Sequence, residues 1–327
     1  MLHEPAFLAQ YSALTRGVGF AALTGRTILS ITGSDRISFL NAFCTNNVKA
    51  LQPGCGCEAF ITSPQGKTLG HVFIFCEADR LVLDAAPGQA SELIAHFDKY
   101  VISEDVQFVD LTSDLCDLLV AGPAAAEVLA NLARSEVPTN LLSHAAAVIA
   151  GMSASVCRVE YAGPASFFVQ AQAAARAAIE QALAAAGAVR CDAAAVESAR
   201  LEAGFPLLGR EITSDNLPQE IGRDSRAISF TKGCYLGQET VARIDALGHV
   251  NRQLVGLRFA GETVPAAGTA LLAGDKEVGQ ITSAAWSPAL QAPLALGMVR
   301  RAHVKPGTQL VSAVGLAEVI ALPIAAR

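Results

Sequence analysis

The chain has 327 residues, more than one compact core usually holds, so two or three domains are expected. Apolar residues make up 52% and charged residues 17%, a composition that excludes a disordered chain. The net charge of −6 provides no positive field, so direct binding of nucleic acid is not expected.

The sequence also argues against a membrane-spanning protein and against a protein-held metal site. Its first stretch, MLHEPAFLAQYSALTRG, has an early glutamate and resembles neither a secretory signal nor a transit peptide. No run reaches the roughly 18 apolar residues of a membrane span. The eight cysteines are scattered, and the nearest pair, Cys55 and Cys57, lacks zinc-site spacing, so no metal site is predicted. We expect a cytoplasmic protein without a membrane partner.

A strand, a glycine turn and a helix occur twice in the first half of the chain. Residues 27–31 are apolar or β-branched and predict a strand, after which Gly33 permits a tight turn. Residues 116–133 repeat this order, and aligning Gly33 with Gly122 superposes the apolar positions of both segments. We predict a duplicated unit, although any two strand–turn–helix segments agree at a few apolar positions.

The remaining elements divide the chain into two regions. Strand and helix patterns mix up to about residue 205 and indicate an α+β region. After residue 250 only short strands separated by Gly, Pro and Ser turns are predicted, which is typical of a small β-barrel or sandwich. The predicted domains are residues 1–250 and 251–327.

Glu202 breaks a local rule. It lies in the last turn of a predicted helix, where the helix dipole disfavours a carboxylate. Such violations can mark functional residues, and a carboxylate can accept two N–H donors from a flat heterocycle such as a pterin. A solvated glutamate is the simpler interpretation, and the residues alone favour it.

Cys234 lies between two glycines in the stretch TKGCYLGQETVARI, residues 231–244. The glycines let the backbone approach a ligand or another segment, and Lys232 is expected to favour the thiolate of Cys234. The stretch also offers an aromatic face and polar groups at Tyr235, Gln238 and Glu239. We interpret Cys234 as a functional thiol, with a packed core thiol as the alternative. Motifs of hydrolases, P-loop NTPases, dinucleotide-binding folds and histidine metal sites do not occur.

The motif K-G-C-Y-x-G-Q-E, followed by Arg243, resembles the signature of YgfZ-type proteins. These are tetrahydrofolate-binding relatives of the glycine-cleavage T-protein, an aminomethyltransferase, and support maturation or repair of iron–sulfur enzymes. The resemblance extends over nearly the whole chain, including ITGSDRISFLNAFCTNNV, RLEAGFPLLGREI, LPQEIG, VGQITSAAWSP and LALGMVR.

The resemblance implies an aminomethyltransferase-like, three-lobed folate-binding ring. Two related α+β lobes and a C-terminal β-barrel would surround a central hole that holds tetrahydrofolate or a one-carbon derivative. Glu202 matches the glutamate that reads the pterin edge, and Arg243 is expected to contact the anionic tail of the folate. The implied site residues are Cys234 and Lys232 as catalytic groups, and Glu202, Tyr235, Gln238, Glu239 and Arg243 as cofactor-binding groups.

One departure from the T-protein pattern bears on activity. T-proteins carry acidic residues in a hairpin, one of them an aspartate needed for one-carbon transfer, whereas Gly70 and His71 stand here. Glycine cannot exchange a proton, and histidine replaces a carboxylate poorly. We therefore predict a monomeric folate-binding protein whose partners are iron–sulfur client enzymes or assembly proteins. The alternatives are a folate-dependent aminomethyltransferase or demethylase, and a non-catalytic adaptor.

Overall fold

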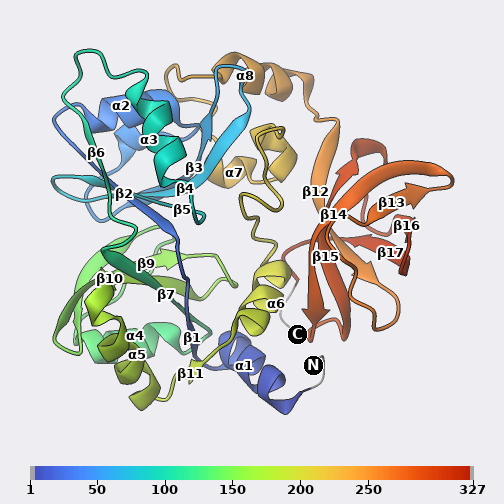
Figure 1. Ribbon diagram of the computed structural model, residues 1–327, viewed down its shortest axis with the longest axis horizontal. Helices are drawn as coiled ribbons and strands as arrows, with labels where there is room; N and C mark the ends of the chain where they lie inside the picture. The colour runs from blue at the N-terminus through green and yellow to red at the C-terminus, as the bar shows by residue number, and fades with distance from the viewer. Residues whose placement is uncertain (1–3, 325–327) are drawn as a thin grey trace.

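The computed structural model describes residues 4–324, which form three lobes (Figure 1). Residues 1–3 and 325–327, the ends of our two predicted domains, lie outside the described residues. Two α+β lobes pack against each other, and a β-barrel stands beside them, so the predicted fold class is confirmed. Among residues 4–324, no helix combines the length and apolar character needed to cross a bilayer.

The first lobe is built on a five-stranded sheet of order β3-β4-β5-β2-β6. Helices α2 and α3 cover its outer face, where Leu29, Ile31, Phe39 and Phe97 share one apolar core. The elements are β2 (Thr27–Thr32), α2 (Arg36–Phe43), the 3-10 turn η1 (Val48–Ala50), β3 (Gly56–Thr62), β4 (Thr68–Cys76), β5 (Leu81–Ala85), α3 (Ala90–Asp98) and β6 (Gln107–Asp110).

The second lobe is built on a six-stranded sheet of order β11-β1-β7-β10-β9-β8. Helices α4 and α5 cover its outer face through Leu129, Ile179 and Leu183. The elements are β1 (Gly19–Ala22), β7 (Leu115–Ala121), α4 (Ala125–Ala133), β8 (His144–Ile149), β9 (Met152–Val159), β10 (Ser166–Gln172), η2 (Ala173–Ala175), α5 (Arg176–Ala185) and β11 (Val189–Arg190).

The sheet orders confirm the predicted duplication. Strands β3, β4, β5 and β2 of the first lobe correspond in order to β8, β9, β10 and β7 of the second. Gly33 and Gly122 occupy equivalent turns with positive φ, +98° and +115°. A Cβ on Gly33 would lie 2.1 Å from the carbonyl oxygen of Asp105, and one on Gly122 would lie 2.4 Å from that of Gly17. Both turns therefore require glycine.

The two repeats exchange a strand. β1 directly precedes β2 of the first lobe in sequence, yet it pairs with β7 of the second. β6 directly precedes β7, yet it pairs with β2. The two sheets then pack face to face, with Ile28, Phe73 and Phe75 of one contacting Leu119 and Phe168 of the other in a shared core. The two lobes consequently form one interlocked body.

The barrel is closed, with strand order β12-β15-β14-β13-β16-β17, as the late run of short strands predicts. A connecting region joins it to the two lobes, and α6 of that region packs against both α1 and the barrel strand β14. The elements are α1 (Pro5–Arg16), α6 (Ala193–Ala203), η3 (Pro218–Ile221), α7 (Asp224–Ala227), α8 (Gln238–Leu247), β12 (Arg252–Phe259), β13 (Ala270–Ala273), β14 (Lys276–Ser287), β15 (Ala292–Arg300), η4 (Arg301–His303), β16 (Gln309–Ser312) and β17 (Gly315–Ile320).

Candidate functional site

A cavity of about 550 Å³, the central cavity, lies where the second lobe, the connecting region and the barrel meet. Its charged lining residues are Arg223, Arg226 and Glu160, and an Arg226 guanidinium nitrogen lies 3.0 Å from a Glu160 carboxylate oxygen. Of the described lining residues, Glu160 is the only one with a carboxylate. The other lining residues are Gly163, Pro164, Ala203, Gly204, Ile221, Gly222, Ser225, Gln253–Gly256, Val304, Pro306 and Ile320–Pro323.

Arg223 belongs to a group of three charged or titratable side chains, of which the other two, Glu58 and His71, are buried. Arg223 donates hydrogen bonds to both carboxylate oxygens of Glu58, the Nη2–Oε2 distance being 2.6 Å, and His71 Nε2 lies 2.6 Å from Glu58 Oε1. Burial alone raises the pKa of Glu58, but the hydrogen bonds from Arg223 and His71 outweigh it and lower the pKa to about 2. Glu58 is therefore a carboxylate at neutral pH.

Aromatic side chains pack behind Arg223, one of the residues that line the central cavity. The Phe205 ring lies under the Arg223 guanidinium at 5.1 Å, and it stacks on Phe73 at 5.7 Å between centroids. Behind it, the space bordered by His71, Phe73 and Phe205 measures about 10 Å³, room for one water molecule at most. The Arg223 guanidinium thus rests on a packed aromatic layer.

Gly70 and His71 lie in the β3–β4 hairpin, as expected. The turn falls between the two strands, and both residues lie on β4, where they pair with Ile61 and Phe60 of β3. His71 is buried and stacks on Phe60, with 5.1 Å between ring centroids. A Cβ on Gly70 would lie 3.1 Å from a Leu93 methyl carbon of α3, so a side chain there would require the Leu93 side chain to shift by a few tenths of an ångström.

Glu202 is buried, and its carboxylate already has protein partners. It accepts hydrogen bonds from the Tyr11 hydroxyl at 2.7 Å, the Ser287 hydroxyl at 2.5 Å and the Ala289 N–H at 3.3 Å. Burial and the hydrogen bond with Glu202 raise the pKa of Tyr11. Ala203 and Gly204 line the central cavity, but Glu202 does not. Glu202 therefore joins α1, α6 and the barrel, and these contacts give no support to its expected pterin-reading role.

Lys232 fastens the K-G-C loop to the first lobe. Its ammonium donates to the carbonyl oxygens of Asn41, Cys44 and Asn46 at 2.6, 2.7 and 2.7 Å, which uses all three N–H groups. It also lies 4.0 Å from the Cys44 sulfur, and burial lowers the pKa of Lys232. No N–H remains for Cys234, so the expected activation of that thiol by Lys232 stays a prediction without a supporting contact.

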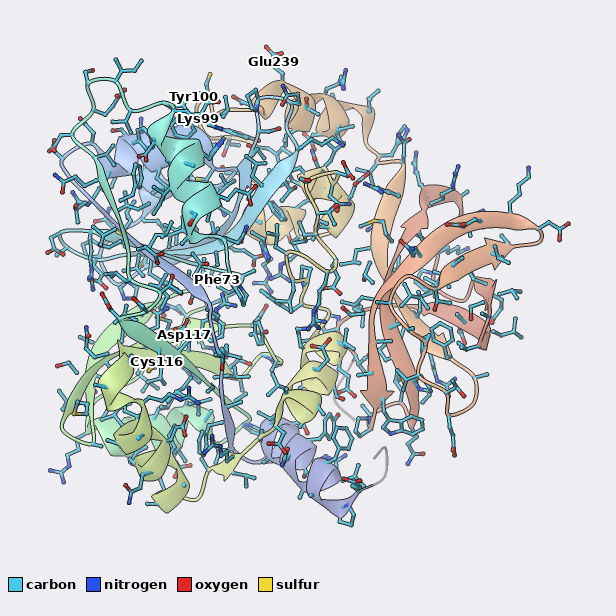
Figure 2. All side chains as sticks on the ribbon, in the orientation of Figure 1. Phe73, Lys99, Tyr100, Cys116, Asp117 and Glu239 are labelled. Atoms are coloured by element: carbon cyan, nitrogen blue, oxygen red, sulfur yellow. The ribbon has the colours of Figure 1, made fainter. Side chains whose placement is uncertain are left out.

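The other residues of the motif lie on either side of this anchor. Cys234 is exposed, whereas Tyr235 is buried 4.9 Å from the Lys232 ammonium, and burial raises the pKa of Tyr235 to about 12. Gln238 accepts a hydrogen bond from the Tyr235 N–H at 3.3 Å. Glu239 and Arg243 are exposed on α8, where Glu239 points outward (Figure 2). Of the described residues that line the central cavity, none belongs to residues 231–244, so the expected folate contacts of this motif remain predictions.

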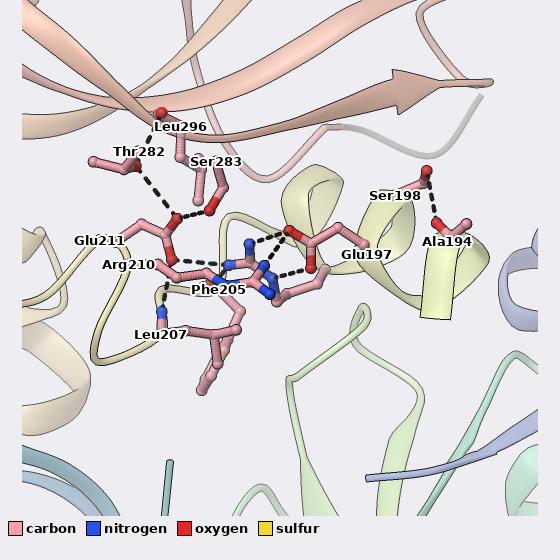
Figure 3. A network of polar contacts seen from close by, with 11 residues as sticks. Ala194, Glu197, Ser198, Phe205, Leu207, Arg210, Glu211, Thr282, Ser283 and Leu296 are labelled. Carbon is pink, nitrogen blue, oxygen red and sulfur yellow. Dashed lines mark hydrogen bonds and ion pairs between the residues drawn. The ribbon is translucent and has the colours of Figure 1, made fainter. Parts of the chain in front are cut away.

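A buried network, which the sequence analysis missed, holds Phe205 in place (Figure 3). Arg200 is fully buried and donates to the Phe205 carbonyl at 2.5 Å, to Glu197 at 2.6 Å and to Glu211 at 3.1 Å. Glu211 in turn accepts a hydrogen bond from the Ser283 hydroxyl of the barrel. The network fixes the segment after α6 against the barrel and, with it, the Phe205 ring under Arg223.

Comparison with known proteins relates both parts of the chain to one protein family. A family model described as the GCVT N-terminal domain matches residues 3–232, and one described as the glycine cleavage T-protein C-terminal barrel domain matches residues 252–324. An aminomethyltransferase of Saccharopolyspora erythraea is 30% identical over 98% of this chain and 90% of its own length. An aminomethyltransferase of Nostoc sp. is 25% identical over 92% of this chain and 82% of its own length. The crystal structure of aminomethyltransferase T from Bartonella henselae superposes with a TM-score of 0.88 at 22% identity, covering 98% of this chain and 89% of that one. The chain therefore belongs to the glycine-cleavage T-protein (GCVT) family.

Proposed function

We propose that this member of the family binds tetrahydrofolate without transferring aminomethyl groups, and assists the assembly or repair of iron–sulfur enzymes in the cytoplasm through Cys234. The observation that carries the proposal is the Arg223–Glu58–His71 group beside the central cavity, because it holds the nearby carboxylate permanently ionised. The iron–sulfur role rests on the resemblance of the K-G-C-Y-x-G-Q-E motif.

The central cavity suits a folate in size and charge. Pockets for drug-sized ligands measure about 300–1,000 Å³, and this one measures about 550 Å³. Arg226 is half-exposed at its edge and, 3.0 Å from Glu160, would hold the Glu160 carboxylate in place for the ligand. Glu160 would accept the N–H donors of the pterin ring, the role that we first assigned to Glu202. When bound, tetrahydrofolate would supply a carrier for one-carbon groups.

Aminomethyl transfer would need a proton donor or acceptor beside the bound folate. General acid–base catalysis works best when the pKa of the group lies near the working pH. Glu58, with a pKa of about 2, is far below that range, and its two oxygens are engaged by Arg223 and His71. The competing proposal, a folate-dependent aminomethyltransferase, rests on what the relatives are named.

Cys234 is placed to meet a partner protein. It is exposed on a loop that Lys232 holds rigidly against the first lobe. One cysteine cannot hold a cluster alone, because iron–sulfur clusters ordinarily take four ligands. A client or assembly protein, or a small thiol, would supply the others.

Calorimetric titration with tetrahydrofolate tests the binding proposal. We expect Arg226→Ala and Glu160→Gln each to weaken affinity at least about tenfold, and Glu136→Gln, an exposed acid outside the cavity, to leave affinity unchanged. Absence of folate binding by the wild-type protein would favour the adaptor hypothesis. A loss of affinity in a fully folded Glu202→Gln variant would restore the original pterin assignment.

Two further assays distinguish the proposed function from aminomethyl transfer and test the role of the Cys234 thiol. Protein mixed with tetrahydrofolate and an aminomethyl donor is expected to form no methylene-tetrahydrofolate, and its formation would establish the transferase alternative. In cells that lack the protein, Cys234→Ser is expected to fail to restore iron–sulfur enzyme activity. Cys55→Ser is the matched control, because Cys55 is also exposed. Full restoration by Cys234→Ser would remove the thiol role.

A further inference from the structure

Two cysteines lie opposite each other where β3 begins and β4 ends. The Cys76 N–H donates to the Cys55 carbonyl oxygen at 2.8 Å, and the Gly54 N–H donates to the Cys76 carbonyl oxygen at 2.9 Å. These bonds continue the β3–β4 ladder beyond its pair of Gly56 with Phe75. Both thiols are free, Cys55 being exposed and Cys76 buried. The backbone therefore holds an accessible thiol beside a protected one.

A tight turn and a bulge fix the position of Cys55. The Cys55 N–H donates to the Gln52 carbonyl oxygen at 2.9 Å, which closes the turn, and Gly54 within it has a φ of +86°. Gly54 and Cys55 together face the single residue Cys76, which is the arrangement of a β-bulge that begins with glycine. The fold itself therefore sets how Cys55 lies relative to Cys76.

The two side chains share one face of the sheet. Side chains alternate along a strand, so Cys55 is on the face of Cys57, and both Cys57 and Cys76 belong to the apolar core under α2 and α3. Opposite residues of a hydrogen-bonded pair have Cα atoms about 5.5 Å apart, within the roughly 4.4–6.8 Å that a disulfide spans. Cys57 is opposite Ile74 and is only a diagonal neighbour of Cys76. Diagonal neighbours lie about 7–8 Å apart, which is too far for a disulfide.

We propose that Cys55 and Cys76 form a reversible disulfide by exchange with a small disulfide such as glutathione disulfide. The Cys55 thiolate attacks one sulfur of that molecule, which breaks its S–S bond and releases one glutathione thiolate. Cys76 then loses its proton and attacks the Cys55 sulfur, which releases the second glutathione thiolate. Two protein thiols are oxidised to one disulfide, glutathione disulfide is reduced to two thiols, and the protons pass from the cysteines to the released thiolates.

The exposure of the two thiols sets the order of the steps. Cys55 is the member of the pair that a molecule in solution can reach, so it forms the mixed disulfide. The second attack is intramolecular and needs no access from solvent to Cys76. Burial raises the pKa of Cys76, and the positive charge of Arg36 opposes part of that effect. The Cys76 thiol donates to the Glu77 carbonyl oxygen at 3.6 Å, a weak bond that the disulfide would replace.

The disulfide would act at the junction of the two repeats. His144 of β8 contacts the same backbone, since its N–H donates to the Gly54 carbonyl oxygen at 2.8 Å and its Nε2 lies 2.9 Å from the Cys76 carbonyl oxygen. Linking Cys55 to Cys76 would stiffen the segment that carries both contacts. Disulfides inside cells are usually transient and redox-sensing, so the pair is expected to stay reduced until oxidants accumulate. The proposal depends neither on folate binding nor on Cys234, and Cys55→Ser therefore remains a control for complementation in unstressed cells.

Peptide mapping after equilibration with glutathione tests the proposal. The reduced full chain is incubated in mildly alkaline buffer at defined ratios of glutathione to glutathione disulfide, its remaining thiols are blocked with N-ethylmaleimide in denaturant, and it is digested with trypsin. We expect a disulfide between tryptic peptide 50–67, which contains Cys55 and Cys57, and tryptic peptide 68–80, which contains Cys76. The linked peptides should separate on reduction with dithiothreitol and should form equally at different protein concentrations. Absence of this link, or a lasting glutathione adduct on Cys55 while Cys76 stays free, would overturn the proposal.

Four variants assign the bond to its two sulfurs. Cys55→Ser should abolish the link, whereas Cys57→Ala, the matched control in the same tryptic peptide, and Cys234→Ser, which removes another exposed thiol, should both retain it. Cys76→Ala should accumulate glutathione on Cys55, because no second thiol displaces it. If Cys76→Ala fails to fold, the comparison of Cys55→Ser with Cys57→Ala still decides, since Cys55 is exposed. A link that persists in Cys55→Ser, or that is lost in folded Cys57→Ala, would contradict the assignment.

Discussion

Replacing Glu58 by glutamine should destabilise the protein by about 3 kcal/mol at pH 7. Glu58 is buried, and its pKa is about 2 against an ordinary value of 4.5. At about 1.4 kcal/mol for each pH unit, this difference corresponds to about 3 kcal/mol of folding free energy. Glutamine keeps the shape of the side chain but leaves the mostly buried Arg223 guanidinium without its counter-charge.

The pH dependence has a definite sign. Because the pKa of Glu58 is lower in the folded protein, its contribution is complete above pH 4.5 and declines as the pH falls toward 2. Urea unfolding of wild type and Glu58→Gln should therefore differ by about 3 kcal/mol at pH 7 and by less than half of that at pH 3. The comparison uses the difference in free energy of unfolding between the two proteins, so that the contributions of other acid-sensitive groups cancel.

A matched control tests whether burial causes the effect. Glu77 pairs with Arg80 at 2.6 Å, but both side chains are about one third exposed, so Glu77→Gln should cost less than about 1 kcal/mol. A loss below about 1 kcal/mol for Glu58→Gln, or a loss that is equal at pH 7 and pH 3, would refute the proposed ionised group beside the cavity.

Three further substitutions probe stability by urea unfolding. Lys232→Met should lower the free energy of unfolding by about 3 kcal/mol and expose the K-G-C loop to proteolysis, because three carbonyl oxygens lose their donor. An unchanged proteolysis pattern would contradict the anchoring role of Lys232. Gly33→Ala should lower the free energy of unfolding by more than about 2 kcal/mol, since its Cβ would lie 2.1 Å from the Asp105 carbonyl oxygen. An unchanged free energy of unfolding would be inconsistent with the described turn. Tyr11→Phe should lower the free energy of unfolding by about 1–2 kcal/mol through the lost hydrogen bond to Glu202, while folate affinity stays unchanged. A selective loss of folate affinity would instead place Glu202 in the ligand site.

The sequence was sufficient to predict features that rest on local patterns. The match of Gly33 with Gly122 indicated the duplication, because both turns need a positive φ that glycine adopts easily. The run of short strands after residue 250 indicated the barrel. In both cases neighbouring residues in sequence carry the whole signal.

The buried charged groups could not be predicted in the same way, because their partners are far apart in sequence. Glu58 meets Arg223 across 165 positions, and Arg26 meets Asp84 across 58. One signal was available and was not used. Glu58, Asp84 and Asp117 are single acids within otherwise apolar strands, and such an acid must find a partner in the interior. Strand pairing, which sets those partners, became visible only in the structure.

The exchanged strands affect how the chain can fold as it leaves the ribosome. The sheet of the first lobe lacks its edge strand until residues 107–110 have emerged, and β1 lacks its neighbour β7 until synthesis has passed residue 121. The N-terminal hundred residues must therefore wait, with an unpaired strand edge exposed, for the second repeat to be translated. A chain truncated between the repeats would retain that exposed edge and should self-associate.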